Sequence, residues 1–163
     1  LSSGYRPVFW MNDNIIFHAI SFTAFLIKYR NCNKSRRDII IFVYIFSSKQ
    51  ITCSAQIPDS PVTIKMNETL ATILVTNIIK NAFVHSPEDG KVTLTLTENE
   101  LVVENSGDSP LDSSRIFERF YQGSKKEGST GLGLALAKTI ADRCGMLLTY
   151  SYVDGMHRFS VKF

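Results

Sequence analysis

The sequence predicts an α+β fold, a two-layer α/β sandwich in which helices cover one face of a mixed, mostly antiparallel sheet. Two long segments, 67–86 and 131–144, repeat apolar residues at helical spacing. The segments 91–104 and 146–163 alternate in the manner of strand hairpins. Helices and hairpins that follow one another in this order place the helices on one side of the sheet.

The bulk composition fits a globular protein with one domain and an appendage. The chain has 163 residues, of which 44% are hydrophobic and 20% are charged. A net charge of +3 gives no reason to expect nucleic acid as a partner. Cys32, Cys53 and Cys144 form no Cys-x-x-Cys pair, so we expect reduced, buried cysteines of a cytosolic domain and neither a zinc site nor a disulfide framework. Because the first residue is Leu1, we interpret the chain as a piece of a longer protein.

Residues 1–48 form an N-terminal segment whose role the pattern does not define. The apolar run 15–27, which contains His18, is too short to span a bilayer. The basic stretch 28–37 fits either a solvated loop or a patch that contacts a membrane surface. The β-branched and aromatic run 39–46 predicts a buried strand.

From residue 49 the pattern becomes regular and predicts a second domain, 49–163. Asn67 can cap the first helix, Gly145 can end the second, and Asp154-Gly155 suits the turn of the last hairpin. The expected elements, in order, are strands 50–57 and 62–66, helix 67–86, strands 91–97 and 101–104, a short helix 112–117, a polar loop 122–130, helix 131–144, and a hairpin of 146–153 and 157–163.

The first helix carries a polar ridge. Asn77, Asn81 and His85 are four residues apart, so they drift by only about 40° per step and lie along one side of the helix. Two amides and an imidazole are costly to bury without partners. Either these side chains face solvent, or they face a ligand.

Four blocks follow one another in the second domain. They are the polar ridge, the Asn105-Ser106-Gly107 turn, the aromatic run 116–121, and Gly128-Ser129-Thr130-Gly131-Leu132-Gly133-Leu134 at the start of the second helix. As an ordered set they resemble the N, G1, F and G2 boxes of the ATP-binding catalytic domain of bacterial sensor histidine kinases, in the GHKL ATPase superfamily. The resemblance covers roughly 49–163 and implies the same α+β sandwich.

The last block suits an anion. Gly131 and Gly133 let the backbone approach closely, and a helix that starts there points unpaired N–H groups and its positive dipole end outward. The resemblance assigns ATP phosphates to this block, namely to Gly128, Thr130, Gly131, Leu132, Gly133 and Leu134. Positive charge is expected from Arg119, or from Lys80, Lys125 or Lys126; the alternative for Arg119 is a surface ion pair with Glu118 or Asp112.

The resemblance also implies roles for the other polar residues. Asn81 corresponds to the Mg²⁺ ligand, a hard oxygen donor, and Asn77 to the asparagine that orients the site. His85 is expected to stack on the nucleotide or to make a polar contact with it. Asn105 stands where the family has the Asp that accepts from the adenine amine, so recognition is kept but weakened. Gly107 matches the glycine that lets the base lie against the backbone.

Two further departures affect nucleotide binding and one affects chemistry. Ser109 replaces the second glycine of the G1 box, and Val84 stands where many members have a phosphate-contacting Lys or Arg. Hydrolytic relatives have a Glu where this chain has Asn77, so no general base is expected for water attack.

The loop 122–130 is expected to be an ATP lid that is disordered without nucleotide and closes with it. Its base would be anchored by Phe117, Phe120 and Tyr121, which alternatively belong to the core.

The resemblance therefore implies a domain that binds Mg-ATP and donates the γ-phosphate to a histidine on a separate dimerisation segment. His18 does not match the phosphoacceptor pattern, and residues 1–48 would be a remnant or a replacement of the dimerisation region. The expected partners are that segment, a downstream response regulator and a second copy in a full-length homodimer; nucleic acid is not expected. The domain would be cytoplasmic and its parent membrane-anchored. The alternatives are a stand-alone serine kinase of the anti-sigma-factor type and a degenerate nucleotide-sensing module.

Overall fold

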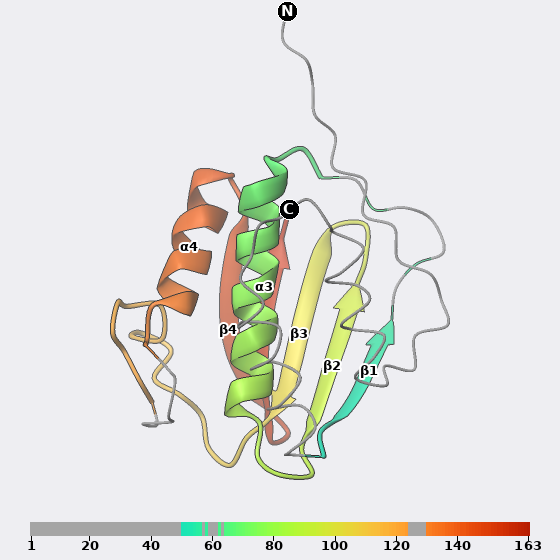
Figure 1. Ribbon diagram of the computed structural model, residues 1–163, viewed down its shortest axis with the longest axis vertical. Coiled ribbons are helices and arrows are strands. Elements are labelled where there is room, and N and C mark those ends of the chain that lie inside the picture. Colours follow the sequence, from blue (N-terminus) through green and yellow to red (C-terminus); the bar gives the residue numbers. More distant parts are fainter. Residues whose placement is uncertain (1–49, 57, 59–61, 63, 124–129) are drawn as a thin grey trace, which may run out of the picture.

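The computed structural model describes residues 50–163, except for residues 57, 59–61, 63 and 124–129. The elements are β1 (Thr52–Gln56), α3 (Glu68–His85), β2 (Lys91–Leu96), β3 (Glu100–Ser106), α4 (Gly133–Arg143), β4 (Leu147–Val153) and β5 (Met156–Lys162). Both helices lie on the same side of the sheet, where α3 packs against β3, α4 packs against β4, and the helices contact each other (Figure 1). The predicted two-layer α+β sandwich is confirmed.

The sheet is mixed, as expected. Its strand order is β1-β2-β3-β5-β4. β1 pairs with β2 in parallel, and the other neighbours pair in antiparallel fashion. A parallel pair requires a crossover connection, and here the connection contains α3. The helix with the polar ridge is therefore tied to the sheet at both ends.

The residues at the two ends of α3 start and stop the helix as the sequence predicts. The Asn67 side chain accepts hydrogen bonds from the N–H groups of Thr69 and Leu70, at 3.0 and 3.2 Å. At the other end Ser86 adopts an extended conformation, as expected for a residue that precedes a proline, here Pro87. The helix therefore begins and ends within one residue of its predicted limits.

The core lies between the helices and the sheet. Its largest fully buried side chains are those of Ile78, Phe83, Val92, Val103, Leu148 and Phe159. Cys53 and Cys144 are half-buried free thiols, so the expected full burial is not reached at either. Burial raises the pKa of Cys53 to about 11, and its thiol therefore stays protonated and unreactive at neutral pH.

Two expected elements are absent from the described residues. Residues 62 and 64–66 form no strand; Val62 and Met66 are buried but their backbone joins no ladder. The segment 112–117 is a series of turns. There the Asp112 carboxylate accepts from the Ser114 N–H and hydroxyl, and this local bonding competes with a helix. The predictions for residues 1–48, including the strand 39–46 and the placement of His18, lie outside the described residues.

The described helices are not membrane spans. Within the described part of 50–163, neither helix combines the length and the apolar character needed to cross a bilayer.

Candidate functional site

A cavity of about 550 Å³ lies between α3, the first turns of α4 and the loop that precedes α4. This volume is typical of a small-molecule binding site. Its described lining comes from three sources: the polar face of α3, the loop residues 111–123 and 130–132, and the start of α4. From the sheet, His157 alone among the described residues contributes to it.

The polar ridge of α3 faces this cavity. Asn77, Asn81 and His85 all line it and are half-buried, and Lys80 and Val84 lie beside them. Asn77 Nδ2 donates to the Ile73 carbonyl at 2.8 Å, which sets the orientation of its amide. Asn77, Asn81 and His85 therefore share one cavity, and their contact with a ligand there stays a prediction.

The start of α4 meets the ridge across the cavity. A β-carbon on Gly133 would lie 3.0 Å from Asn77 Oδ1, a tight contact that a larger residue would relieve only by displacing the Asn77 amide. Leu132, the N-cap, provides no side-chain hydrogen bond, and the first turn carries no acidic residue. The N–H groups of this turn thus lack a side-chain cap, which leaves a favourable environment for an anion.

Gly131 is needed for a different reason. It adopts a left-handed φ of +67°, and its β-carbon would come within 2.7 Å of the Phe120 carbonyl carbon. The Phe120 N–H donates to the Gly131 carbonyl at 2.9 Å, which joins the two ends of the loop. Thr130, Leu132 and Leu134 also line the cavity. Lys126 and Gly128, with the rest of 124–129, lie outside the described residues.

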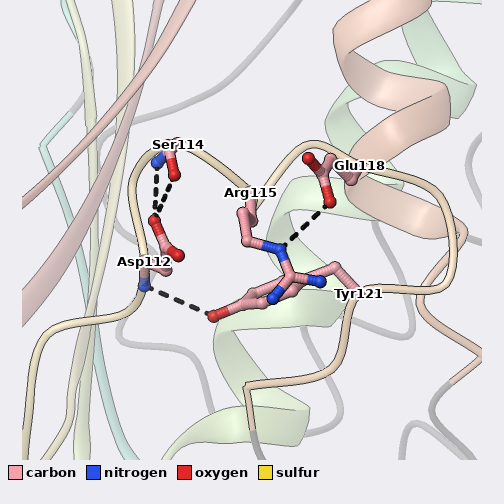
Figure 2. A network of polar contacts seen from close by, with 5 residues as sticks. All are labelled: Asp112, Ser114, Arg115, Glu118 and Tyr121. Atoms are coloured by element: carbon pink, nitrogen blue, oxygen red, sulfur yellow. Dashed lines mark hydrogen bonds and ion pairs between the residues drawn. The ribbon is translucent and has the colours of Figure 1, made fainter.

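Arg119 lines the cavity, and the alternative ion pair with Glu118 or Asp112 is not formed. Glu118 instead pairs with Arg115, whose Nε is 3.2 Å from the Glu118 carboxylate. Asp112 accepts from Ser114, and this hydrogen bonding lowers the pKa of the Asp112 carboxyl (Figure 2). Within the described part of the chain Arg119 has no acidic partner, so its charge is available at the cavity.

A small network fixes the loop that carries Arg119. The Arg115 guanidinium lies over the Tyr121 ring, 5.2 Å from its centre, and the Tyr121 hydroxyl accepts from the Asp112 N–H (Figure 2). Phe117 and Tyr121 pack against the core, as expected for anchors of this loop. Phe120 is 72% exposed, which excludes the alternative that it is a core residue.

Asn105 and Gly107 lie at the sheet side of the site but do not line the cavity. Asn105 is buried, its Nδ2 donates to the Ser106 carbonyl at 3.0 Å, and its Oδ1 accepts no hydrogen bond from the described residues. The side chain that lies against Gly107 is that of His157: a β-carbon at Gly107 would be 2.0 Å from His157 Nε2. Ser109 is exposed.

Sequence reasoning did not identify His157 or its partner Tyr150. The Tyr150 hydroxyl lies 2.9 Å from His157 Nδ1 and accepts from the Leu111 N–H. One signal was available: His157, Phe159 and Val161 alternate along the last strand, and all three are buried. A histidine in an otherwise apolar inward-facing row indicates either a hydrogen-bonded core residue or a site residue.

The donors in the cavity suit a magnesium nucleotide. The Asn81 carboxamide is a hard oxygen donor on the ridge, opposite the uncapped start of α4. The unpaired Asn105 Oδ1 is an acceptor that a ligand amine would satisfy. No group of three His, Cys, Asp or Glu residues that could hold a metal is found among the described residues, so a cation here would depend on Asn81 together with ligand oxygens.

This sandwich, with its cavity between a carboxamide ridge and a glycine-rich helix start, defines the chain as an α+β domain of the nucleotide-binding class. The model of the histidine kinase-, DNA gyrase B- and HSP90-like ATPases matches residues 66–163. The chain belongs to that family.

The relatives of this chain include a sensor histidine kinase and a heme sensor protein. The chain is 35% identical over 111 residues to the sensor histidine kinase WalK of Bacillus subtilis, which covers 61% of this chain and 18% of WalK. It is 28% identical over 134 residues to the heme sensor protein HssS of Staphylococcus epidermidis, covering 79% of this chain and 26% of HssS. The chain thus spans about a fifth to a quarter of these relatives.

Solved structures show the same fold. The catalytic domain of the histidine kinase ThkA aligns with a TM-score of 0.63 at 20% identity, covering 78% of this chain and 88% of that domain. The mycobacterial sensor histidine kinase MprB aligns with a TM-score of 0.62 at 22% identity, covering 74% of this chain and 86% of that structure. The resemblance of the sequence to histidine kinase catalytic domains is therefore confirmed.

Proposed function

We propose that this domain binds Mg-ATP in the cavity and presents the γ-phosphate to a histidine on a separate dimerisation segment, as the catalytic part of a two-component sensor kinase. The observation that carries the proposal is the closeness of Asn77 and Gly133, with 3.0 Å between Asn77 Oδ1 and a β-carbon built on Gly133. This contact brings a carboxamide ridge and an anion-binding helix start to the same cavity.

The polar residues divide between the two ends of the nucleotide. Asn81 holds Mg²⁺ and Asn77 orients the site. Arg119, with Lys126, supplies positive charge, and the phosphates lie against the backbone of Gly128, Thr130, Gly131, Leu132, Gly133 and Leu134. His85 contacts the nucleotide from the ridge, while Asn105 and Gly107 serve the base. Magnesium held by Asn81 would neutralise part of the negative charge of the phosphates.

The lining favours phosphotransfer over hydrolysis. None of the described residues that line the cavity is an Asp or a Glu, so within the described part of the chain the lining offers no carboxylate to activate water. A γ-phosphate held here reacts when an outside nucleophile is brought to it. This supports a role in binding and positioning, with the acceptor histidine supplied by another segment.

The remaining parts of the proposal concern the whole protein. The partners are the histidine-containing dimerisation segment, a response regulator downstream, and a second copy in the full-length homodimer. The domain works in the cytoplasm, and its parent is anchored in the membrane. These statements rest on the kinship with sensor kinases, of which this chain spans only a part.

One experiment separates the proposal from its alternatives. The chain is incubated with Mg-ATP labelled at the γ-phosphate and with a dimerisation segment that carries a phosphoacceptor histidine. Acid-labile phosphohistidine on that segment is the expected product. Acid-stable phosphoserine on a partner would indicate the serine-kinase alternative. If a fluorescent ATP analogue does not bind in the presence of Mg²⁺, the nucleotide assignment is wrong.

A further inference from the structure

We propose that Tyr150 is a positioning residue for the base end of the nucleotide: its hydroxyl holds the backbone of Leu111, so that the Leu111 side chain forms an apolar wall of the cavity against which the adenine ring packs. The inference rests on the proposed nucleotide binding and names the wall that takes the base. Three features support it: the place of Leu111 in the cavity, the hydrogen bonds that hold its segment, and the charge of that segment.

The Leu111 side chain belongs to the wall of the cavity. It is half-buried, packs against the core and lines the cavity. Its Cδ2 atom lies against Gly123, where an added β-carbon would come within 2.5 Å of it. Ile116, which is buried, lines the same cavity. The loop thus offers apolar carbon on this wall, which suits a planar purine ring better than it suits a charged group.

Two tyrosine hydroxyls of β4 hold the segment 107–112. The Tyr152 hydroxyl donates to the Gly107 carbonyl at 2.8 Å, and the Tyr150 hydroxyl accepts from the Leu111 N–H at 2.9 Å. The two tyrosines are two residues apart in β4, so their side chains project from the same face of the strand. The segment is therefore anchored to the sheet, and the anchor at Leu111 is Tyr150.

Tyr150 can make this contact whichever way the hydrogen between it and His157 lies. The Tyr150 oxygen is 2.9 Å from His157 Nδ1, and either atom can donate to the other. In both cases the oxygen keeps a lone pair for the Leu111 N–H. Loss of the hydroxyl would take this acceptor from a partly buried N–H, so the backbone would shift to find another.

The segment 107–112 suits the uncharged end of a nucleotide. Its residues are Gly-Asp-Ser-Pro-Leu-Asp, so it carries two carboxylates and no basic side chain. Negative charge in this segment disfavours a triphosphate beside it and leaves an uncharged base unaffected. The groups that favour an anion belong to other residues of the cavity, namely Arg119 and the uncapped start of α4. Charge thus directs the phosphates away from Leu111 and the base toward it.

Nuclear Overhauser measurements on the methyl-labelled wild-type chain with Mg-ATP test the contact directly. We expect cross-peaks between the Leu111 methyl groups, assigned by through-bond experiments, and the carbon-bound ring protons of adenine. If ATP binds and these methyl groups show no such cross-peak, or contact the ribose alone, the inference is wrong. The Leu111 amide should also exchange slowly with solvent, because Tyr150 accepts its hydrogen bond. Exchange at the rate of an unstructured chain would overturn the anchoring role, and neither measurement needs a variant.

Calorimetric titration with Mg-ATP tests whether Tyr150 acts through Leu111. L111A should weaken binding by about tenfold and Y150F by about three- to fivefold. In the L111A background Y150F should cause little further loss, because the wall that it positions is gone. Additive losses would show that Tyr150 acts by another route, and the inference would be wrong. V161A, a large-to-small change in the core of β5 outside the cavity lining, is the control for lost stability and should leave the affinity unchanged.

The outcomes distinguish this inference from the proposed function. If the wild-type chain binds no nucleotide in the presence of Mg²⁺, the proposed function fails and the inference with it. If the wild-type chain binds ATP and either L111A or Y150F binds it equally well, the inference alone fails. Circular dichroism and thermal melting establish that each variant is folded at the temperature of the titration.

Discussion

The side chain of Asn77, in the middle of α3, lies close against Gly133, the first residue of α4: a β-carbon built on Gly133 would lie 3.0 Å from Asn77 Oδ1, a tighter contact than most β-carbons make. Two residues that are far apart in the chain thus lie side by side, and both line the cavity. A substitution at Asn77 or Gly133 therefore changes both the packing of the two helices and the geometry of the site.

Asn81→Ala tests the metal assignment. We expect Mg²⁺-dependent ATP affinity to fall by about tenfold or more, because the substitution removes the proposed ligand itself. The free energy of unfolding should change by less than about 0.5 kcal/mol, because no hydrogen bond of the Asn81 side chain is found in the described part of the chain. Titration calorimetry with Mg²⁺ and with EDTA measures the first, and urea denaturation measures the second. Asn99→Ala, in an exposed turn, is the matched control; unchanged Mg²⁺-dependent binding in Asn81→Ala would refute the assignment.

Asn105→Asp separates recognition from stability. We expect tighter ATP binding, because a carboxylate accepts the adenine amine with charge assistance. The nucleotide-free protein should lose about 1–3 kcal/mol of stability, because the new oxygens are buried and one of them faces the Ser106 carbonyl, which now receives no hydrogen bond from residue 105. Thermal melting with and without Mg-ATP shows both effects in one experiment. Equal or weaker affinity would mean that asparagine is not a deficit at this position.

Gly107→Ala tests the contact between Gly107 and His157. The new methyl group would lie 2.0 Å from His157 Nε2, so the ring, which Tyr150 holds, must shift. We expect a loss of about 1–3 kcal/mol in the free energy of unfolding. In a double-mutant cycle with His157→Ala most of this loss should disappear, because the obstructing ring is gone. Additive losses would show that Gly107 is required for another reason.

The Asp112 carboxyl offers a test of the loop network by pH. Its pKa is lowered from 3.8, chiefly by the hydrogen bond from the Ser114 hydroxyl and then by that from the Ser114 N–H. A group with a lowered pKa in the folded state contributes stability above its ordinary value, and this contribution is lost as the pH falls through the folded value. Ser114→Ala should therefore raise the pKa of Asp112 toward 3.8 in an NMR titration. Ser113→Ala, which leaves the hydroxyl of Ser114 in place, should not change it.

The sequence predicted the parts of this fold that depend on local signals. The capped helix 67–86, the terminal hairpin and the clustering of Asn77, Asn81 and His85 all follow from periodicity and capping. The described residues 62 and 64–66 form no strand although Val62 and Met66 are buried, because burial alone does not supply a backbone ladder. The roles of individual site residues stay predictions, since no ligand contact has tested them.

The site residues that were missed depend on contacts between distant parts of the chain. The His157 ring is held in its position because Tyr150 in β4 bonds its Nδ1 and Leu111 in a loop bonds Tyr150. Similarly, Gly107 is required by a ring 50 residues away. A short stretch of sequence cannot predict these contacts, because they arise from the register of distant strands and the placement of a loop.

The parallel pairing of β1 with β2 has a practical consequence for anyone who expresses this domain. A recombinant fragment trimmed to the region that matches the family model, residues 66–163, would omit β1, the strand that pairs with β2. The edge of β2 would then be exposed to intermolecular pairing. Fragments that start before Thr52 keep that edge covered, so the choice of starting residue governs whether the purified material stays monodisperse.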